Sequence, residues 1–353
     1  MSATHYKFGP TTIAKLNNPG EIRQFLDDSL LKSDTVIIKP NWVSTDQADF
    51  TDADTLRVFI EALDSRIVVT ESYCLARSLN LLSRGLGFTV EGKEVDWKWL
   101  LKGDGWKWLI QNPDWEWFKT GEHRHQIVLE DKAFIDEYGF ADLFEEFKVE
   151  YINATEEVWS SRIANPAEVK GIVESRYKPV QNEKLYAMVP AKLFNLRNST
   201  FISFARMKMY ASFTIKNLFG MIIDPLRPYW HGAKNRTIVQ SIIDINKIYH
   251  SLFSVFGICE SIFTMPVIHP EGKYEGIYSG KYDIYEGSGF VALGGNLAAL
   301  DALLLHLTDP TIRMVAEVNR GPIDLAGDEL GLEIDRECFE GAVEKVGKWI
   351  TPS

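Results

Sequence analysis

Two runs of β-branched residues, separated by one helix-length segment, constrain the fold more than any other feature. Residues 34–39 and 66–70 have the composition of buried strands. Residues 51–63 between them have the pattern of a helix, with acidic residues near its N-terminal end, where they suit the helix dipole. Strand, helix and strand at this spacing form a βαβ unit, whose two strands are parallel. The chain is therefore predicted to be an α/β protein with a mostly parallel sheet flanked by helices.

Polar residues stand where these two strands end. Lys39 closes the first strand, and Asn41 follows a proline that stops the hydrogen-bonding ladder. Glu71 closes the second strand. Parallel strands end at one edge of the sheet, and open α/β sheets bind ligands at that edge. Lys39, Asn41 and Glu71 are therefore candidate substrate-binding residues.

A second polar cluster lies at residues 206–220. The apolar run at residues 201–205 indicates a buried strand that leads into it. Thr214 can cap a helix that begins next, and Gly220 can end that helix. Cationic and hydrogen-bonding groups crowd this junction, namely Arg206, Lys208, Tyr210, Lys216 and Asn217. Because the chain as a whole has a formal charge of −11, this local basic cluster predicts a pocket for a small anion.

Lys208 and Lys216 lie among apolar residues of the sequence. A lysine in such surroundings must be paired, have a lowered pKa or face a ligand. Both could therefore bind a carboxylate or phosphate, or act as a base, and a structural ion pair is the alternative. Tyr210 is a candidate proton donor, and a packed core tyrosine explains it equally well.

Acidic residues outside the cluster are candidates for a different role. Asp301 stands in an almost wholly apolar helix, where it needs a partner such as a lysine or a backbone N–H. Alternatively, Glu71, Asp244 and Asp301 could offer oxygen ligands to a divalent cation such as magnesium. His231 and the nearby Arg236 are candidate substrate-binding residues. His231 could also serve as an acid or base, although a loop histidine is more often a surface residue.

Several classes of protein are disfavoured. The acidic charge argues against nucleic-acid and anionic-membrane partners. Three scattered cysteines without C-x-x-C exclude a zinc knuckle or an iron–sulfur run and fit the cytoplasm. The sequence has no P-loop, no dinucleotide-binding fingerprint, no nucleophile elbow, no signal peptide and no membrane span.

Residues 91–121 are expected to be an insertion. This segment contains six of the ten tryptophans, namely Trp97, Trp99, Trp106, Trp108, Trp115 and Trp117. The simpler interpretation is a small lid or hairpin packed by aromatic side chains. The alternatives are an aromatic wall over the pocket or a contact in a homodimer.

The motifs together resemble the DUF362 family, a broad bacterial and archaeal group defined as a domain of unknown function. The resemblance covers roughly residues 39–301 and rests on Lys39-Pro40-Asn41, Glu71, Lys208, Thr214, Lys216-Asn217-Leu218-Phe219-Gly220, Asn296 and Asp301. The chain departs from the family where Tyr210 replaces a frequent histidine and where ferredoxin-like cysteine motifs are missing. The resemblance implies two α/β lobes, expected at residues 1–180 and 181–353, with a cleft lined by these motifs.

The first functional hypothesis is a cytoplasmic enzyme for a small carboxylate- or phosphate-bearing metabolite. Lys39, Arg206 and Lys208 would hold the anion. Lys216 or Tyr210 would move a proton, while Asn217 orients the substrate. The reaction would be redox-neutral, of the lyase, isomerase or cyclase type, as in specialised biosynthesis. The alternatives are a metal-dependent oxidoreductase and a non-catalytic scaffold that binds partners through its tryptophan-rich segment.

Overall fold

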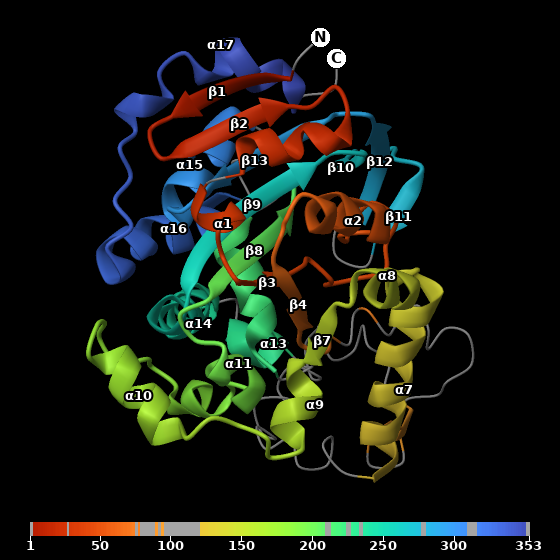
Figure 1. Cartoon of the computed structure of the whole chain (residues 1–353), viewed down its shortest axis with the longest axis vertical. Helices are drawn as coiled ribbons and strands as arrows, with labels where there is room; N and C mark the ends of the chain where they lie inside the picture. Colours follow the sequence, from red (N-terminus) through yellow and green to blue (C-terminus); the bar gives the residue numbers. More distant parts are fainter. Residues whose placement is uncertain are drawn as a thin grey trace.

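The computed structural model describes residues 3–26, 28–74, 77, 89–90, 93–94, 121–208, 213–223, 227–232, 236–276, 280–308 and 316–350. One eight-stranded sheet forms the centre of the described chain, in the order β1-β2-β13-β9-β8-β3-β4-β7, with helices on both faces (Figure 1). Its strands are β1 (Thr4–Phe8), β2 (Thr11–Lys15), β3 (Thr35–Lys39), β4 (Arg66–Glu71), β7 (Glu150–Asn153), β8 (Thr200–Arg206), β9 (Ser254–Ser261) and β13 (Phe290–Gly294). The predicted α/β class is confirmed.

Five adjacent strands of this sheet, from β9 to β7, are parallel, and the remaining pairs are antiparallel. The predicted βαβ unit is present as β3, α2 (Ala53–Glu61) and β4. The Asp52 side chain caps α2 by accepting a hydrogen bond from the Thr55 backbone N–H. Both strands are almost wholly buried, as expected for parallel strands covered on two faces.

The order of the parallel strands reverses at β3. The chain passes from β3 to β4 and β7 on one side, and then returns to place β8 and β9 on the other side. Lys39 at the end of β3 is paired in register with Ser203 of β8. In open α/β sheets, such a switch point leaves a space at the carboxyl ends of the strands where ligands bind. The candidate site therefore belongs beside the β3–β8 pair.

Side chains that alternate along these strands enter two separate cores. Ile37 and Phe201 belong to one core, while Ile38 and Ile202 belong to the other. Helices α14 (Ile238–Leu252) and α15 (Leu297–Leu307) contribute to the first core, and α2 and α8 (Phe140–Phe147) contribute to the second. Because the sheet is buried on both sides, the groups at its strand ends are held on a rigid frame.

Several segments differ from what their residue patterns predict. The apolar repeat at residues 237–256 predicts one helix, but α14 ends at Leu252 and β9 begins two residues later, because pairing with β8 and β13 overrides the pattern. Residues 184–189 are predicted to be a strand, but the 3-10 helix η2 (Glu183–Ala187) forms there and the Asn182 side chain caps it. The glycine-rich region 266–289 is predicted to be a loop, but it overlaps a three-stranded antiparallel sheet of β10 (Thr264–Ile268), β12 (Gly280–Glu286) and β11 (Tyr274–Gly276).

The division into two lobes is not confirmed. Strands from both sides of residue 180 lie in one sheet, since β3, β4 and β7 continue directly into β8 and β9. Of the tryptophan-rich segment, only residues 93–94 and 121 are among those described, so the predictions about it lie outside the described residues. Residues 133–147 have the pattern of one helix, but they belong to two, α7 (Gly121–Glu137) and α8, which Gly139 separates in a left-handed conformation (φ 77°).

The other described elements lie around this frame. They are η1 (Pro19–Phe25), α1 (Asp28–Leu31), β5 (Thr89–Val90), β6 (Lys93–Glu94), α9 (Ala154–Trp159), α10 (Pro166–Glu174), α11 (Ala191–Asn195), α12 (Thr214–Asn217), η3 (Leu218–Met221), α13 (Pro228–His231), α16 (Ala316–Leu330), η6 (Glu337–Phe339), α17 (Ala342–Val346) and η7 (Gly347–Trp349). None of the helices in the described ranges has the length and apolar character needed to cross a bilayer.

Candidate functional site

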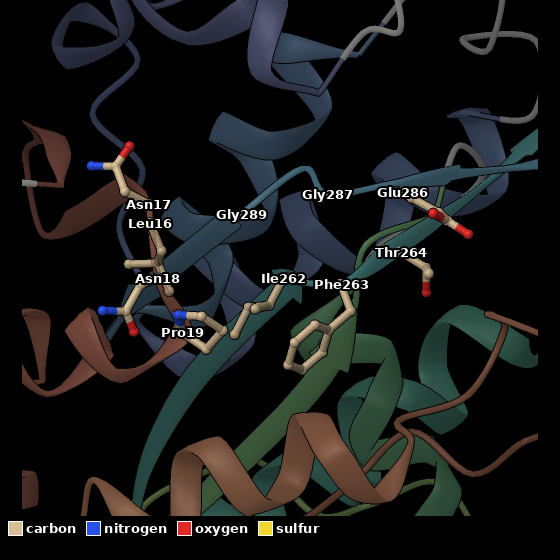
Figure 2. A pocket seen from close by; sticks show the side chains of 10 residues that line it. All are labelled: Leu16, Asn17, Asn18, Pro19, Ile262, Phe263, Thr264, Glu286, Gly287 and Gly289. Atoms are coloured by element: carbon tan, nitrogen blue, oxygen red, sulfur yellow. The ribbon is translucent and has the colours of Figure 1, made fainter. Parts of the chain in front are cut away.

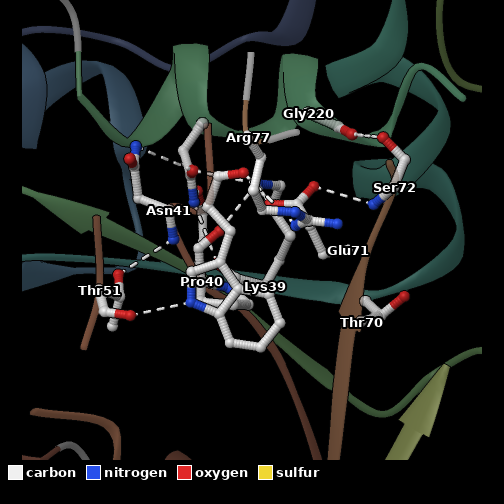
Figure 3. Close-up of polar contacts among 12 residues, drawn as sticks. Lys39, Pro40, Asn41, Thr51, Thr70, Glu71, Ser72, Arg77 and Gly220 are labelled. Carbon is white, nitrogen blue, oxygen red and sulfur yellow. Dashed lines mark hydrogen bonds and ion pairs between the residues drawn. The ribbon is translucent and has the colours of Figure 1, made fainter. Parts of the chain in front are cut away.

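A buried ion pair between Lys39 and Glu71 joins the ends of β3 and β4. The Lys39 ammonium lies 2.6 Å from the Glu71 carboxylate, and each side chain is 2% exposed. Lys39 also donates to the Pro40 carbonyl at 2.8 Å and to Asn217 Oδ1 at 3.1 Å (Figure 3). Burial, which outweighs the attraction of Glu71, lowers the pKa of Lys39 to about 8. These three acceptors take up all three N–H donors of Lys39, so its side chain is held in place by protein groups and has no donor left for a ligand.

Gly220 lies directly against this pair. A Cβ atom built at Gly220 would be 2.5 Å from Lys39 Nζ and 3.0 Å from Glu71 Oε1. Glycine is therefore required here by close approach, and the residue lies inside η3 rather than ending the helix as predicted. The position fixes the distance between η3 and the ends of the two strands.

Two asparagines connect the pair to Lys208. Asn217 Nδ2 donates to the Lys39 carbonyl at 3.0 Å, and the Asn41 amide lies 3.5 Å from Asn217 Oδ1. Lys208, just beyond β8, donates to Asn41 Oδ1 at 3.1 Å and forms an ion pair with Asp49 at 2.9 Å. The structure thus brings Lys39, Asn41, Glu71, Lys208 and Asn217 together, as the sequence predicts for groups at the strand ends.

Lys216 differs from these lysines because nothing in the described chain pairs with it. No carboxylate in the described ranges lies within ion-pair distance of its ammonium, and it forms no hydrogen bond with a described residue. The side chain is half-buried. Burial and then the Lys208 ammonium lower the pKa of Lys216 to about 8, while Asp49 acts in the opposite direction. Lys216 is therefore a cation that can lose its proton near neutral pH.

Asp301 holds the helix that carries Lys216. From α15, its carboxylate accepts the backbone N–H groups of Phe213 and Thr214 at 2.9 Å and of Ile215 at 3.0 Å. It also accepts the Thr214 hydroxyl at 2.7 Å, so Asp301 caps α12 and the prediction that Thr214 does so is wrong. Burial outweighs these bonds and raises the pKa of Asp301 to about 6.

Arg206 is fully buried, and described groups bind its guanidinium on several sides. It lies 3.0 Å from the Glu260 carboxylate and 3.3 Å from that of Asp52. It also donates to the Ala48 carbonyl at 2.5 Å, to the Thr264 carbonyl at 2.9 Å and to the Thr264 hydroxyl. These contacts tie β8 to the loop after β3 and to β10, and they leave Arg206 facing protein groups.

A groove of about 500 Å³ is lined in part by Thr264, whose carbonyl also binds Arg206 (Figure 2). Its walls come from the end of β2, the start of η1, the β9–β10 turn and the end of β12, and they consist of Leu16, Asn17, Asn18, Pro19, Ile262, Phe263, Thr264, Glu286, Gly287 and Gly289. None of the predicted site residues lines it.

The structure does not gather the three predicted metal ligands. Glu71 binds Lys39, Asp301 caps α12, and the Asp244 carboxylate accepts the Gln181 backbone N–H at 2.7 Å and lies 3.2 Å from the Lys247 ammonium. Within the described ranges, no group of three or more histidine, cysteine, aspartate or glutamate side chains has the arrangement of a metal site.

Three predicted residues remain, His231, Arg236 and Tyr210. His231 is half-buried, with its ring 5.5 Å from that of Phe219, and Arg236 is exposed. Tyr210 lies outside the described residues.

Sequence reasoning missed two buried arginines near the pair. Arg227 donates to the Ser72 hydroxyl at 2.6 Å and to the Gly220 carbonyl at 2.9 Å, and it lies 3.9 Å from Glu71. Arg77 forms an ion pair with Asp131 and lies over the Phe134 ring. Both arginines lower the pKa of Lys39 further, after burial. The contacts that make both arginines part of the site come from residues far away in the sequence, Asp131 for Arg77 and Ser72 for Arg227, so no local pattern marks them.

Comparison of the chain with known proteins gives no match among protein-family models, curated proteins or solved structures. The resemblance to the DUF362 family therefore stays a prediction from the motifs alone.

Proposed function

We propose that the protein is an enzyme for a small carboxylate- or phosphate-bearing metabolite, which it binds at the carboxyl ends of β3 and β8. The observation that carries this proposal is the half-buried Lys216 ammonium, which has no carboxylate or hydrogen-bond partner among the described residues and whose pKa is lowered in part by the charge of Lys208. The charges of Lys208 and Asp49 both act on Lys216, and Asp49 is already paired with Lys208 at 2.9 Å, so an anion is the favoured partner for Lys216. The chemistry would be redox-neutral proton transfer, of the lyase, isomerase or cyclase type.

From their contacts, we infer a different role for each group of predicted residues. Lys208 and Lys216 would hold the anion, and Lys216 in its neutral form would accept a proton. Lys39, Glu71 and Asn217 would form the rigid wall behind them, because their donors and acceptors bind one another. This assignment moves Lys39 from contact with the anion to support of the site.

Isothermal titration calorimetry with inorganic phosphate, malonate and 2-oxoglutarate tests the proposal. Wild type should bind at least one of these anions in the millimolar range, and Lys216→Met should weaken that binding by about tenfold or more, which is about 1.4 kcal/mol. Lys192→Met is the matched control, because the exposed Lys192 already has an ion-pair partner, Glu157, at 3.3 Å. Its affinity should equal that of wild type.

Two results would overturn the proposal. One is the absence of any binding by folded wild-type protein at millimolar anion. The other is equal binding by wild type, Lys216→Met and Lys208→Met. The Lys216 variant is the more informative of the two, since removing Lys208 also leaves Asp49 without its ion pair.

A further inference from the structure

The three lysines at this sheet edge differ in what occupies the amine. Lys39 has three acceptors and is enclosed, and Lys208 has Asp49 at 2.9 Å and Asn41 at 3.1 Å. Lys216 has neither a carboxylate nor a hydrogen bond among the described residues, although it is half-buried. An amine can attack an electrophile only when its lone pair is free, so the contacts single out Lys216.

We propose that Lys216 is a nucleophile that forms an imine with the carbonyl group of an oxo acid, while Lys208 binds the acid's carboxylate or phosphate. This inference rests on the proposed function and adds to it a substrate class and a covalent step. A lysine placed in a dry site beside a second cation is one of the recognised ways to activate an amine.

The local structure supports a reactive amine at this position. Asp301 accepts three backbone N–H groups at the start of α12, so the helix that carries Lys216 is fixed to α15. Phe213 and Phe219, which precede and follow α12 in the sequence, are both buried. Lys39 has a similarly lowered pKa, but Glu71 and two further acceptors occupy its amine. The lowered pKa therefore does not distinguish Lys216 from Lys39, whereas their contacts do.

The proposed step is balanced without a further reactant. The neutral Lys216 amine adds to the carbonyl carbon, and the carbinolamine that results loses one water, which carries away the carbonyl oxygen. The protonated imine then draws electrons from the neighbouring C–H or C–carboxylate bond, and a proton or carbon dioxide leaves. Protonation of the carbon and addition of one water to the imine release the product and restore the amine.

Reduction by borohydride tests this step on the intact protein. Folded protein would be incubated near pH 7.5 with pyruvate, 2-oxoglutarate, glyoxylate or pyridoxal 5′-phosphate, reduced, and mapped by peptide mass spectrometry. The neutral fraction of an amine with a pKa of about 8 exceeds that of an ordinary lysine on the order of a hundredfold at this pH. Lys216 should therefore be labelled at least about tenfold faster than the exposed Lys192 with one or more of these carbonyl compounds.

The controls separate this inference from the proposed function. Lys216→Arg keeps a cation but cannot form an imine, so it should lose the label and retain anion binding in calorimetry. Lys192→Arg should keep both. Labelling of Lys216 no faster than of Lys192 with all four compounds would overturn the imine, whereas intact anion binding would leave the proposed function standing. If wild-type protein showed neither the faster labelling of Lys216 nor any anion binding, both the imine and the proposed function would be overturned.

Discussion

Replacing Gly220 with alanine puts a methyl group where Lys39 and Glu71 already lie. The added Cβ would be 2.5 Å from Lys39 Nζ, 2.6 Å from Lys39 Cε and 3.0 Å from Glu71 Oε1. Ordinary contacts between such atoms are longer by about 1 Å. Lys39 cannot swing away without loss, because it is buried and bound to Glu71, the Pro40 carbonyl and Asn217.

The cost follows from what must move. Overpacking in a rigid core destabilises by ~1–3 kcal/mol, and breaking a buried ion pair destabilises by ~3–5 kcal/mol. Partial adjustment of η3 would relieve some of the strain. We therefore expect Gly220→Ala to lower the free energy of unfolding by about 2–4 kcal/mol.

Urea denaturation followed by circular dichroism and tryptophan fluorescence measures this change. Gly171→Ala is the matched control, because Gly171 is an exposed residue of α10 and an added Cβ there meets nothing within 4 Å. That control should be neutral or stabilising by up to ~1 kcal/mol, as for glycine in a helix interior. The same substitution would thus have opposite effects at the two positions.

A double-mutant cycle with Lys39→Ala shows whether the contact is the cause. Removing the Lys39 side chain removes the atoms that the methyl group would strike, so Gly220→Ala should cost at least about 1 kcal/mol less in that background. If Gly220→Ala behaved like Gly171→Ala, or if its cost were the same with and without Lys39, the described packing of the site would be refuted.

Three further predictions concern the groups around this site. Lys39→Met should lower the free energy of unfolding by ~3–5 kcal/mol because it leaves the Glu71 charge buried, and Glu71→Leu in the same chain should recover most of the loss in urea titrations. Arg206→Lys should lower the free energy of unfolding by ~2–4 kcal/mol, whereas Arg66→Lys, at an exposed position, should lower it by less than ~1 kcal/mol. If Arg206 only stabilises the fold, neither substitution should change the anion affinity measured by calorimetry. The pKa of Asp301 is raised to about 6 in the folded protein, so the folded state binds its proton at higher pH than the unfolded state does. Its contribution to stability is therefore greatest below about pH 4 and is lost as pH rises through 6, by on the order of 1–3 kcal/mol relative to Asp301→Asn. If the free energy of unfolding, measured by urea titration, changed with pH equally in wild type and Asp301→Asn, this prediction would be contradicted.

Local patterns predict the frame of the site well and its outer parts poorly. The βαβ unit at β3, α2 and β4 follows from composition because both strands are buried on two faces and the helix has an apolar side. Strand β9 cannot be predicted in this way, because its apolar run continues that of α14. It is a strand because it pairs with β8 and β13.

The gathering of polar groups at strand ends can be predicted from local sequence, because a charged residue directly after a buried strand has only that edge of the sheet to occupy. This placed Lys39, Asn41, Glu71 and the stretch around Lys208 correctly. Which lysine is paired depends on contacts between distant parts of the chain. Glu71 binds Lys39 from 32 residues away and Asn217 binds it from 178 residues away, so no local pattern could show that Lys39 is enclosed while Lys216 is left without a partner in the described chain. The reactivity of a lysine depends on those distant contacts, because burial and neighbouring charges, and not the residue type, set its pKa.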